Sequence, residues 1–377
     1  MVLLLTPEDT RGILTMKEAV NAVEQAVREW GQSVLRLNWA RHRIHSPANA
    51  RVSVHQGTVP GLGAAGMMTH CELVRILPDK IQKYAVRGRP VTVLYSADTG
   101  ELQCIILGEL SCRDLVAGGI ATNSVIELRT AATSAVGMKY TARQNAASAG
   151  IFGSSGQAMN HLVALCQVRN IRRVKVYSPT IENRNAFAVN MSRLLGIEVQ
   201  PCDEPREVCR DVDILMNCSN ANRPLFQGDW LAKGITINAF QASNIGLVES
   251  GYSREKRREL DDETVRRTNV YVVLSKEQAQ IDQQDGIYDP VSRGMLRWDQ
   301  MIELKDLVAG RSTGRSSDDQ IVLFNNNAGQ GVTDVALGAR VFQNALRAGV
   351  GLQLDLDGAQ ARDTELLRTT LRPAAPG

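Results

Sequence analysis

The stretch Ala149-Gly150-Ile151-Phe152-Gly153-Ser154-Ser155-Gly156-Gln157-Ala158 decides the fold of this chain. Small and apolar residues form a predicted strand, a glycine-containing turn follows, and a helix begins after the turn. Peptide N–H groups at the start of a helix lack partners and favour negative charge, so this order suits a bound phosphate. A further predicted strand, Arg173 to Ser178, follows at the spacing of a dinucleotide-binding βαβ unit. An ordinary βα turn stays open as the alternative, because Ser155 and Ala158 replace two glycines of the usual G-x-G-x-x-G pattern.

The rest of the chain predicts an α/β protein with two domains. From Ala149 to about Val308, short apolar strands alternate with turns or helices, which is typical of a Rossmann-type doubly wound parallel sheet. Before it, helical spacing over Lys17 to Leu37, including Val34, is followed by strand-like alternation up to Gly100, which indicates an α+β domain. We place the α+β domain at residues 1–128, completed by a strand (320–324) and helix within 320–350. The Rossmann domain spans 129–319, and residues 351–377 form a polar, partly disordered tail.

Composition excludes several classes of function. The net charge of +3 implies no general attraction to nucleic acid or to a membrane surface. The apolar start, Met1 to Leu5, is too short for a signal peptide, and no membrane span is predicted. The seven cysteines are scattered without a C-x-x-C pair, so we expect buried thiols in a reduced, cytoplasmic protein and no metal site.

Four motifs in order resemble those of the ornithine cyclodeaminase/mu-crystallin family. They are Arg129-Thr130-Ala131-Ala132, the turn from Gly153 to Ala158, Gly234 to Ala239 (G-x-x-I-N-A), and Asn325 to Asp334, which ends in G-x-x-x-x-D. The similarity runs from about Arg43 to Gly349. The resemblance implies a homodimer, with the N-terminal segment and a C-terminal helix forming a substrate and dimerisation domain. It also implies NAD(P) on the central domain and an α-amino acid or imine as the small-molecule substrate.

The resemblance also assigns substrate-binding residues. Arg43 and Arg129 fall where the family clamps the substrate carboxylate, a role suited to the guanidinium fork. A surface arginine is the alternative for Arg43, and a structural ion pair is the alternative for Arg129. Met68 stands at or beside the family's lysine in a G-x-K strand, and Thr92 completes the expected substrate residues. His70 is a nearby candidate proton donor, with a structural histidine as its alternative.

The predicted reaction class depends on Ser243. In cyclodeaminases of the family an aspartate follows the I-N-A strand, and Ser243 occupies that place here. A hydroxyl cannot serve as a carboxylate base near neutral pH, so hydride transfer at a C=N or C–N bond is favoured over cyclodeamination. Asp334 is the replacement acid to consider, although it also suits a helix N-terminus or a nicotinamide contact. An ammonia-lyase with recycled NAD is the second candidate function, and a ligand-binding protein without turnover is the third.

Cofactor choice is predicted from the end of the strand Arg173 to Ser178. No acid stands at its tip to bind a ribose 2′-hydroxyl, so NADP(H) is favoured and NAD(H) stays open, with Glu182 as the reason. Ser178-Pro179-Thr180 also suits a plain turn and helix cap. The expected cofactor-binding residues are Thr130, Gly153, Ser154, Ser155, Gly156, Gln157, Ala158, Ser178, Thr180, Arg184 and Asn238.

Overall fold

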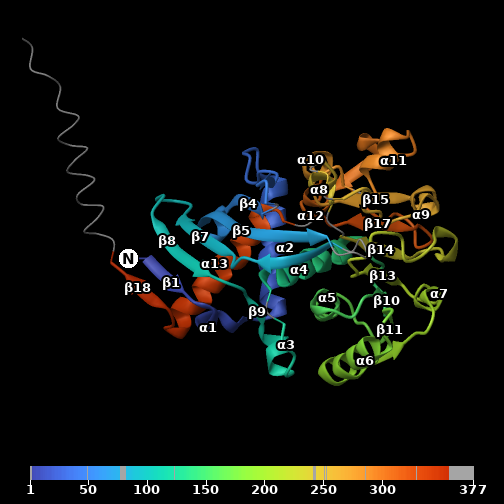
Figure 1. Ribbon diagram of the computed structural model, residues 1–377, viewed down its shortest axis with the longest axis horizontal. Helices are drawn as coiled ribbons and strands as arrows, with labels where there is room; N and C mark the ends of the chain where they lie inside the picture. Colours follow the sequence, from blue (N-terminus) through green and yellow to red (C-terminus); the bar gives the residue numbers. More distant parts are fainter. Residues whose placement is uncertain are drawn as a thin grey trace, which may run out of the picture.

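The computed structural model describes residues 2–48, 50–76, 82–122, 124–240, 243–249, 251, 253–284, 286–327 and 329–355. Side chains are described throughout these ranges except at 74–76 and 82–87. Two lobes, each built on its own sheet, lie side by side, and α2 (Met16–Gln32) and α4 (Val125–Thr141) run between them (Figure 1).

A mixed sheet forms the first lobe. Its strand order is β18 (Leu352–Leu354), β1 (Val2–Leu5), β8 (Leu102–Leu107), β7 (Val91–Ser96), β5 (Ala64–Ile76), β4 (Ala50–Val59) and β3 (His42–His45), with β6 (Gln82–Arg87) beside β5. The long helix α13 (Gly331–Ala348) packs against β4, β5 and β7. β18 lies at the start of the tail that we predict to be partly disordered, and it pairs with β1. Residues 356–377 lie outside the described part.

The second lobe confirms the predicted doubly wound sheet. All its pairings are parallel, in the order β12 (Glu198–Pro201), β11 (Arg173–Tyr177), β10 (Ser148–Phe152), β13 (Ile214–Asn217), β14 (Thr236–Ala239), β17 (Val322–Asn325), β15 (Val270–Val273) and β16 (Met301–Glu303). The strand predicted at 320–324 is β17 and lies between β14 and β15. The chain therefore returns to the first lobe at α13, and not at the strand 320–324 as predicted.

Short elements complete the described fold: α1 (Pro7–Thr10), β2 (Arg11–Leu14), β9 (Ser111–Cys112), α3 (Arg113–Ala117), α5 (Gly156–Cys166), α6 (Ile181–Leu195), α7 (Pro205–Val208), α8 (Ile245–Glu249), α9 (Asp262–Arg267), α10 (Lys276–Ile281), α11 (Tyr288–Ser292) and α12 (Leu304–Val308). Helix α2 starts at a capping box formed by Thr15 and Glu18. It ends at Gln32, not at Leu37 as predicted, because the chain turns extended at Ser33 and leaves Val34 fully exposed.

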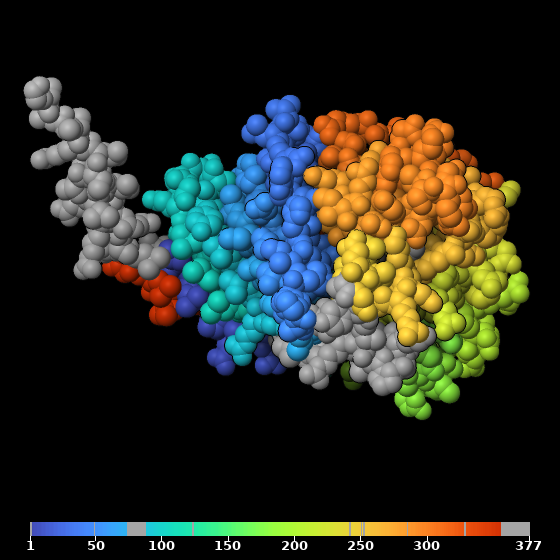
Figure 2. Space-filling model, turned by 45° about the horizontal axis from the view of Figure 1, so that its top comes forward, coloured from blue at the N-terminus to red at the C-terminus, as the bar shows by residue number. Residues whose placement is uncertain are grey.

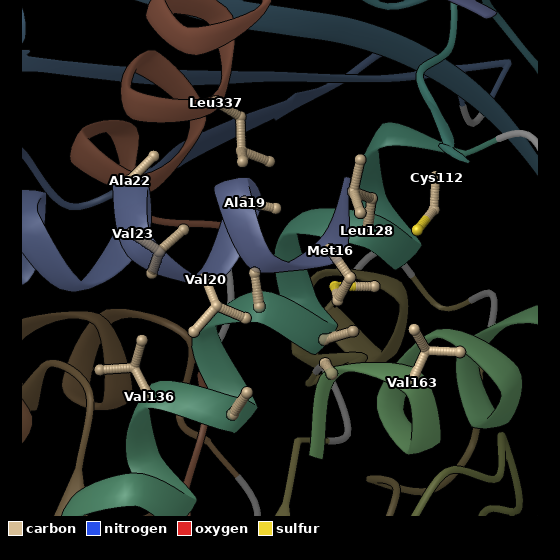
Figure 3. Close-up of a cluster of buried hydrophobic side chains, with 14 of the residues drawn as sticks. Met16, Ala19, Val20, Ala22, Val23, Cys112, Leu128, Val136, Val163 and Leu337 are labelled. Carbon is tan, nitrogen blue, oxygen red and sulfur yellow. The ribbon is translucent and has the colours of Figure 1, made fainter. Parts of the chain in front are cut away.

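The lobes share one apolar core (Figure 3). Met16, Val20 and Val23 of α2 lie among Leu128 and Val136 of α4, Val163 of α5 and Leu337 of α13. The predicted alanine-rich helix is α4, and its small residues are needed where it meets the sheet. A Cβ on Gly137 would overlap the Phe324 ring. This close packing holds Arg129 and Thr130 at the boundary between the lobes.

Two further expectations concern the thiols and the membrane. All seven cysteines are free thiols, but Cys71 is exposed and Cys166 is only partly buried, so burial of every thiol is wrong. Among the described helices, none has both the length and the apolar character needed to span a bilayer. The described residues also contain no group of three or more His, Cys, Asp or Glu side chains suited to a metal ion.

Candidate active site

A cavity of about 510 Å³ is lined by residues of both lobes. On one side lie polar side chains of β4 and β5, and on the other lie the turns that follow β10, β11 and β13. In the space-filling view the medium-blue segment near residue 50 contacts the second lobe, in yellow and orange (Figure 2). The buried ion pairs of Arg41 and Arg43 with Asp282 cross this boundary.

The register of β4 and β5 explains the polar wall of the cavity. Arg51 lies opposite Glu72, Ser53 opposite His70, and His55 opposite Met68. Side chains alternate between the two faces of a strand, so these residues share one face. Except for Met68, they line the cavity.

Two predicted substrate residues lie deeper than the cavity. Met68 is fully buried, and its neighbour across β7 is Thr92, which is 7% exposed. Neither residue is among those that line the cavity. The wall has Met68 in place of a lysine. His55 lies opposite Met68 on β4, and His70 follows Met68 by two positions on β5.

Asp334 lies behind this wall, in the first turn of α13. Its Oδ2 is 2.8 Å from His55 Nδ1, and its Oδ1 accepts a hydrogen bond of 3.0 Å from Arg129 Nε. Close contact of α13 with β4 permits this geometry, since a Cβ on Gly331 would overlap the carbonyl oxygen of Gln56. Burial alone would raise the pKa of Asp334, but Arg129 and His55 outweigh burial and hold the pKa below its usual value.

The two side chains that bind Asp334 each carry a second nitrogen atom without a partner in the described chain. Within the described residues, His55 Nε2 and Arg129 Nη1 are buried and make no hydrogen bond. Both residues line the cavity. Buried polar atoms are nearly always paired, so a ligand or water in the cavity is the natural partner of these two nitrogens.

Burial keeps both histidines of the wall neutral near pH 7. It lowers the pKa of His55 to about 3 and that of His70 to about 4, despite the nearby carboxylates of Asp334 and Glu72. The two rings meet edge to face with centroids 5.6 Å apart. His70 Nε2 is 3.8 Å from Glu72 Oε1, which is too long for a hydrogen bond.

Arginines dominate the charge of the cavity. Arg41 and Arg43 both bind Asp282, while Arg51 binds Glu72. The Arg43 side chain is 15% exposed and lines the cavity, so it is not a surface residue. Our sequence reasoning missed five residues of the site: Arg41, Arg51, His55, Glu72 and Asp282. The alternation Arg51, Ser53, His55 was a usable signal, because polar residues at every second position of a strand mark a polar face.

The turn after β10 fits a dinucleotide pyrophosphate. Gly153 has φ +107°, and a Cβ there would overlap the carbonyl oxygen of Cys218, so only glycine fits. The N-cap residue of α5, Ser155, makes no side-chain cap to the helix amides, which leaves that end suited to an anion. Asn238, fully buried in β14, has neither amide atom paired within the described residues.

The predicted cofactor and substrate residues divide into two sets. Those that line the cavity are His70, Arg43, Arg129, Thr130, Gly153, Ser154, Ser155, Gln157, Ser178 and Thr180. Those outside its lining are Met68, Thr92, Gly156, Ala158, Arg184, Asn238, Ser243 and Asp334. At Gly156 the backbone meets the carboxylate of Glu127, which itself lines the cavity.

Arg184 and Ser243 have local partners. Arg184 forms an ion pair with Asp203 and donates to the Ser178 carbonyl oxygen at 3.2 Å. Ser243 Oγ accepts a hydrogen bond of 3.1 Å from the Ile245 amide at the start of α8. These bonds do not direct either side chain into the cavity.

Comparison with known proteins places the chain among enzymes of related architecture. A model of the ornithine cyclodeaminase/mu-crystallin family matches residues 2–349. A Delta(1)-pyrroline-2-carboxylate reductase of Bacillus cereus is 25% identical over 359 residues, covering 94% of this chain and 100% of that protein. The Thermococcus litoralis reductase of the same name, solved with NADH and L-proline, has a TM-score of 0.74 at 27% identity, covering 94% and 100% of the two chains. An archaeal alanine dehydrogenase dimer with bound NAD has a TM-score of 0.75 at 26% identity, covering 94% and 99%.

Proposed function

Because this chain belongs to the ornithine cyclodeaminase/mu-crystallin family, we propose that it is an NAD(P)H-dependent reductase. Its proposed substrates are α-imino acids, cyclic or derived from an amino acid, whose C=N bond is reduced to an amine. The relatives that support this reaction are about a quarter identical in sequence, and the family spans several reactions. The geometry of the cavity is therefore the main support for this reaction.

One observation carries the proposal: the dinucleotide turn at Gly153 and the Arg129 guanidinium open on the same cavity. Arg129 is fixed through Nε by Asp334, and its Nη1 is buried without a partner in the described chain. A substrate carboxylate would supply that partner in the strong, charge-assisted geometry of a guanidinium pair. A bound nicotinamide dinucleotide would supply the hydride.

The protein's own residues orient and enclose the substrate in this proposal. Arg129 and Arg43 hold the carboxylate, and the Asp282 and Asp334 carboxylates keep these guanidiniums in place. Phe240 forms part of the apolar lining and stacks on His161, with ring centroids 4.5 Å apart. These contacts exclude water and restrict the substrate to one orientation, which raises the rate of hydride transfer.

Ser243 supports a reductase over an ammonia-lyase. Its hydroxyl caps the start of α8 and has no carboxylate chemistry to offer. Asp334 is a weak replacement base, since both of its oxygens already bind Arg129 and His55. We therefore propose that Asp334 is a positioning residue. A cyclodeaminase that recycles NAD remains the second candidate, supported by family membership.

For the cofactor we propose NADP(H) in preference to NAD(H). Ser178 and Thr180 line the cavity at the end of β11, whereas Glu182 is exposed and outside the lining. Arg184 is paired with Asp203 and lies outside the cavity lining, so we propose no contact between Arg184 and the cofactor. Relatives solved with NADH or NAD support NAD(H) as the alternative.

We also propose a homodimer. Several large apolar side chains near β3 and β4 are exposed on the single chain: Val34, Leu35, Trp39, Ile44 and Val52. Ile44 and Val52 are paired across the two strands. Exposed apolar clusters of this kind favour a protein partner, and an alanine dehydrogenase relative is a dimer. Ile44→Asp should lower the dimer fraction measured by analytical ultracentrifugation.

A substrate panel tests the proposed reaction. Five- and six-membered cyclic α-imino acids, and pyruvate with methylamine, are each incubated with NADPH while cofactor absorbance and ammonia are followed. We expect oxidation of one cofactor for each amine formed with at least one of these compounds. Ammonia release from L-ornithine without net cofactor change would instead support the lyase.

A further inference from the structure

His55 is the least expected residue of the site. It is 2% exposed, lines the cavity, and has its Nδ1 2.8 Å from Asp334 Oδ2. Because Asp334 is held as a carboxylate by Arg129, it accepts the hydrogen bond, so the proton lies on Nδ1 and the lone pair on Nε2. Nε2 has no hydrogen-bond partner in the described part of the chain.

We infer that His55, oriented by Asp334, exchanges the proton with the substrate nitrogen; this inference rests on the proposed reductase function. A carboxylate that fixes one imidazole nitrogen while the other faces a reacting group is an effective arrangement for acid–base catalysis. Arg129 binds the other oxygen of the same carboxylate. A substrate carboxylate on Arg129 is therefore placed close to His55, and so is the α-nitrogen next to that carboxylate.

His70, which also lines the cavity, is the competing candidate. Its ring lies edge to face against His55, but no described acceptor orients it, since Glu72 is 3.8 Å away and is bound by Arg51. An unoriented imidazole is a poorer proton donor than an oriented one. His70 is accordingly assigned to shaping the wall beside His55.

The proton balance of the step is simple. A bound reduced nicotinamide would supply a hydride to the imine carbon, and the imine nitrogen takes a proton from Nε2 of the His55 imidazolium. The C=N bond thereby becomes an HC–NH bond, the nicotinamide would be oxidised, and the neutral imidazole regains a proton from water. In the oxidative direction Nε2 accepts the proton from the amine.

Substrate binding should favour the protonated form of His55 that this step needs. Burial lowers the pKa of His55, Asp334 raises it, and Arg129 and Arg41 lower it further. Among the described residues, His70 is a further titratable neighbour of the His55 ring. A carboxylate bound to Arg129 neutralises that cation. Ligand binding should therefore raise the pKa of His55 and increase the fraction of the ring that is protonated at a given pH.

NMR titration of the histidine Cε1–H signals tests the predicted rise in the pKa of His55 and does not require catalytic turnover. The probe is pyrrole-2-carboxylate, a planar carboxylate that cannot accept a hydride, and His55→Gln and His70→Gln assign the signals. We expect the probe to raise the pKa of His55 by at least about one unit. A pKa of His55 that does not move on saturation with the probe would overturn the inference, whatever substrate the enzyme uses.

Kinetics on the active imino acid provide the second readout. His55→Gln should lower kcat by about a hundredfold or more, change KM little, and remove an ionisation from the pH profile of kcat. His70→Gln, the matched control, should keep that ionisation. If His55→Gln keeps both the ionisation and a kcat within about threefold of wild type, His55 is not the proton donor. Absence of turnover by wild type on every imino acid would instead contradict the proposed function and leave the NMR result to decide about His55.

Discussion

Arg129 of α4 and Asp334 of α13, 205 positions apart in the sequence, are joined by a hydrogen bond of 3.0 Å in the buried wall of the cavity. The pair links the helix that bridges the lobes to the helix that returns to the first sheet. The pair also fixes the position of the Arg129 guanidinium, which we propose binds the substrate carboxylate.

Arg129→Ala should therefore affect both function and stability. It removes the carboxylate clamp and leaves Asp334 buried without its strongest cation, which costs roughly 3–5 kcal/mol for a buried pair. We expect kcat/KM to fall at least about a hundredfold, whereas NADPH affinity, measured by fluorescence, should change little. Arg129→Lys keeps the charge and should retain part of the stability measured by denaturant unfolding. Near wild-type kcat/KM in Arg129→Ala would move the clamp elsewhere.

Gly153→Ala tests the dinucleotide turn. The new Cβ would overlap the carbonyl oxygen of Cys218 at a positive φ, so the turn must shift and dinucleotide binding should be lost. Gly196→Ala is the control, because Gly196 has φ +65° with nothing within 4 Å of its Cβ position. The control should cost about 1 kcal/mol of stability and leave NADPH affinity unchanged. Equal NADPH affinities in the two variants would contradict the assignment of the turn.

Glu127→Gln should strengthen dinucleotide binding. The Glu127 carboxylate lies against Gly156 at the start of α5, where a pyrophosphate is expected, and like charges repel. Removing the charge should lower the Kd for NADPH severalfold, and the gain should shrink at high salt. Glu182→Gln, on an exposed part of α6, should leave the Kd unchanged. A weaker Kd in Glu127→Gln would show that the carboxylate binds the cofactor.

Thr180→Asp tests cofactor choice at the tip of β11. Thr180 is exposed, lines the cavity and is the N-cap residue of α6, a position that accepts aspartate well. A carboxylate there should repel a 2′-phosphate and accept a hydrogen bond from a 2′-hydroxyl. Wild type should bind NADPH more tightly than NADH, and the variant should reverse the order. A wild-type preference for NADH would show that the absence of an acid at the tip was misinterpreted.

His161 should make stability depend on pH. Burial lowers its pKa from 6.5 to about 4, so the unfolded chain takes up a proton at a higher pH than the folded protein. Its stabilising contribution is complete above about pH 6.5 and is lost as the pH falls toward 4, about 3 kcal/mol in total. His55 and His70 act in the same direction. Denaturant unfolding should show a flatter pH dependence for His161→Gln than for wild type.

The sequence predicted the architecture well where local pattern determines structure. The strands from β10 to β15, helix α4 and the turn at Gly153 are confirmed, because each follows from apolar periodicity or a glycine requirement. The end of α2 and the position of β17 were mispredicted. Both depend on tertiary packing: Ser33 begins an extended link, and β17 inserts between two strands that come earlier in the chain.

The site was predicted only in part, for a related reason. Arg129 and four residues of the turn after β10 belong to local motifs and line the cavity: Gly153, Ser154, Ser155 and Gln157. The partnership of His55 with Asp334 depends on the register of β4 and on close contact between β4 and α13. No local pattern in the sequence specifies that contact, so the pairing of His55 with Asp334 was missed and Asp334 was considered alone.

The fate of the hydride tests the central claim most directly. The enzyme is incubated with NADPH deuterated at the transferred position of C4 and with the active imino acid, and the amine is analysed by mass spectrometry. A reductase should place one deuterium on the former imine carbon for each cofactor oxidised, with no ammonia released. An unlabelled product, formed with ammonia in excess of the oxidised cofactor, would contradict the reductase and restore the cyclodeaminase.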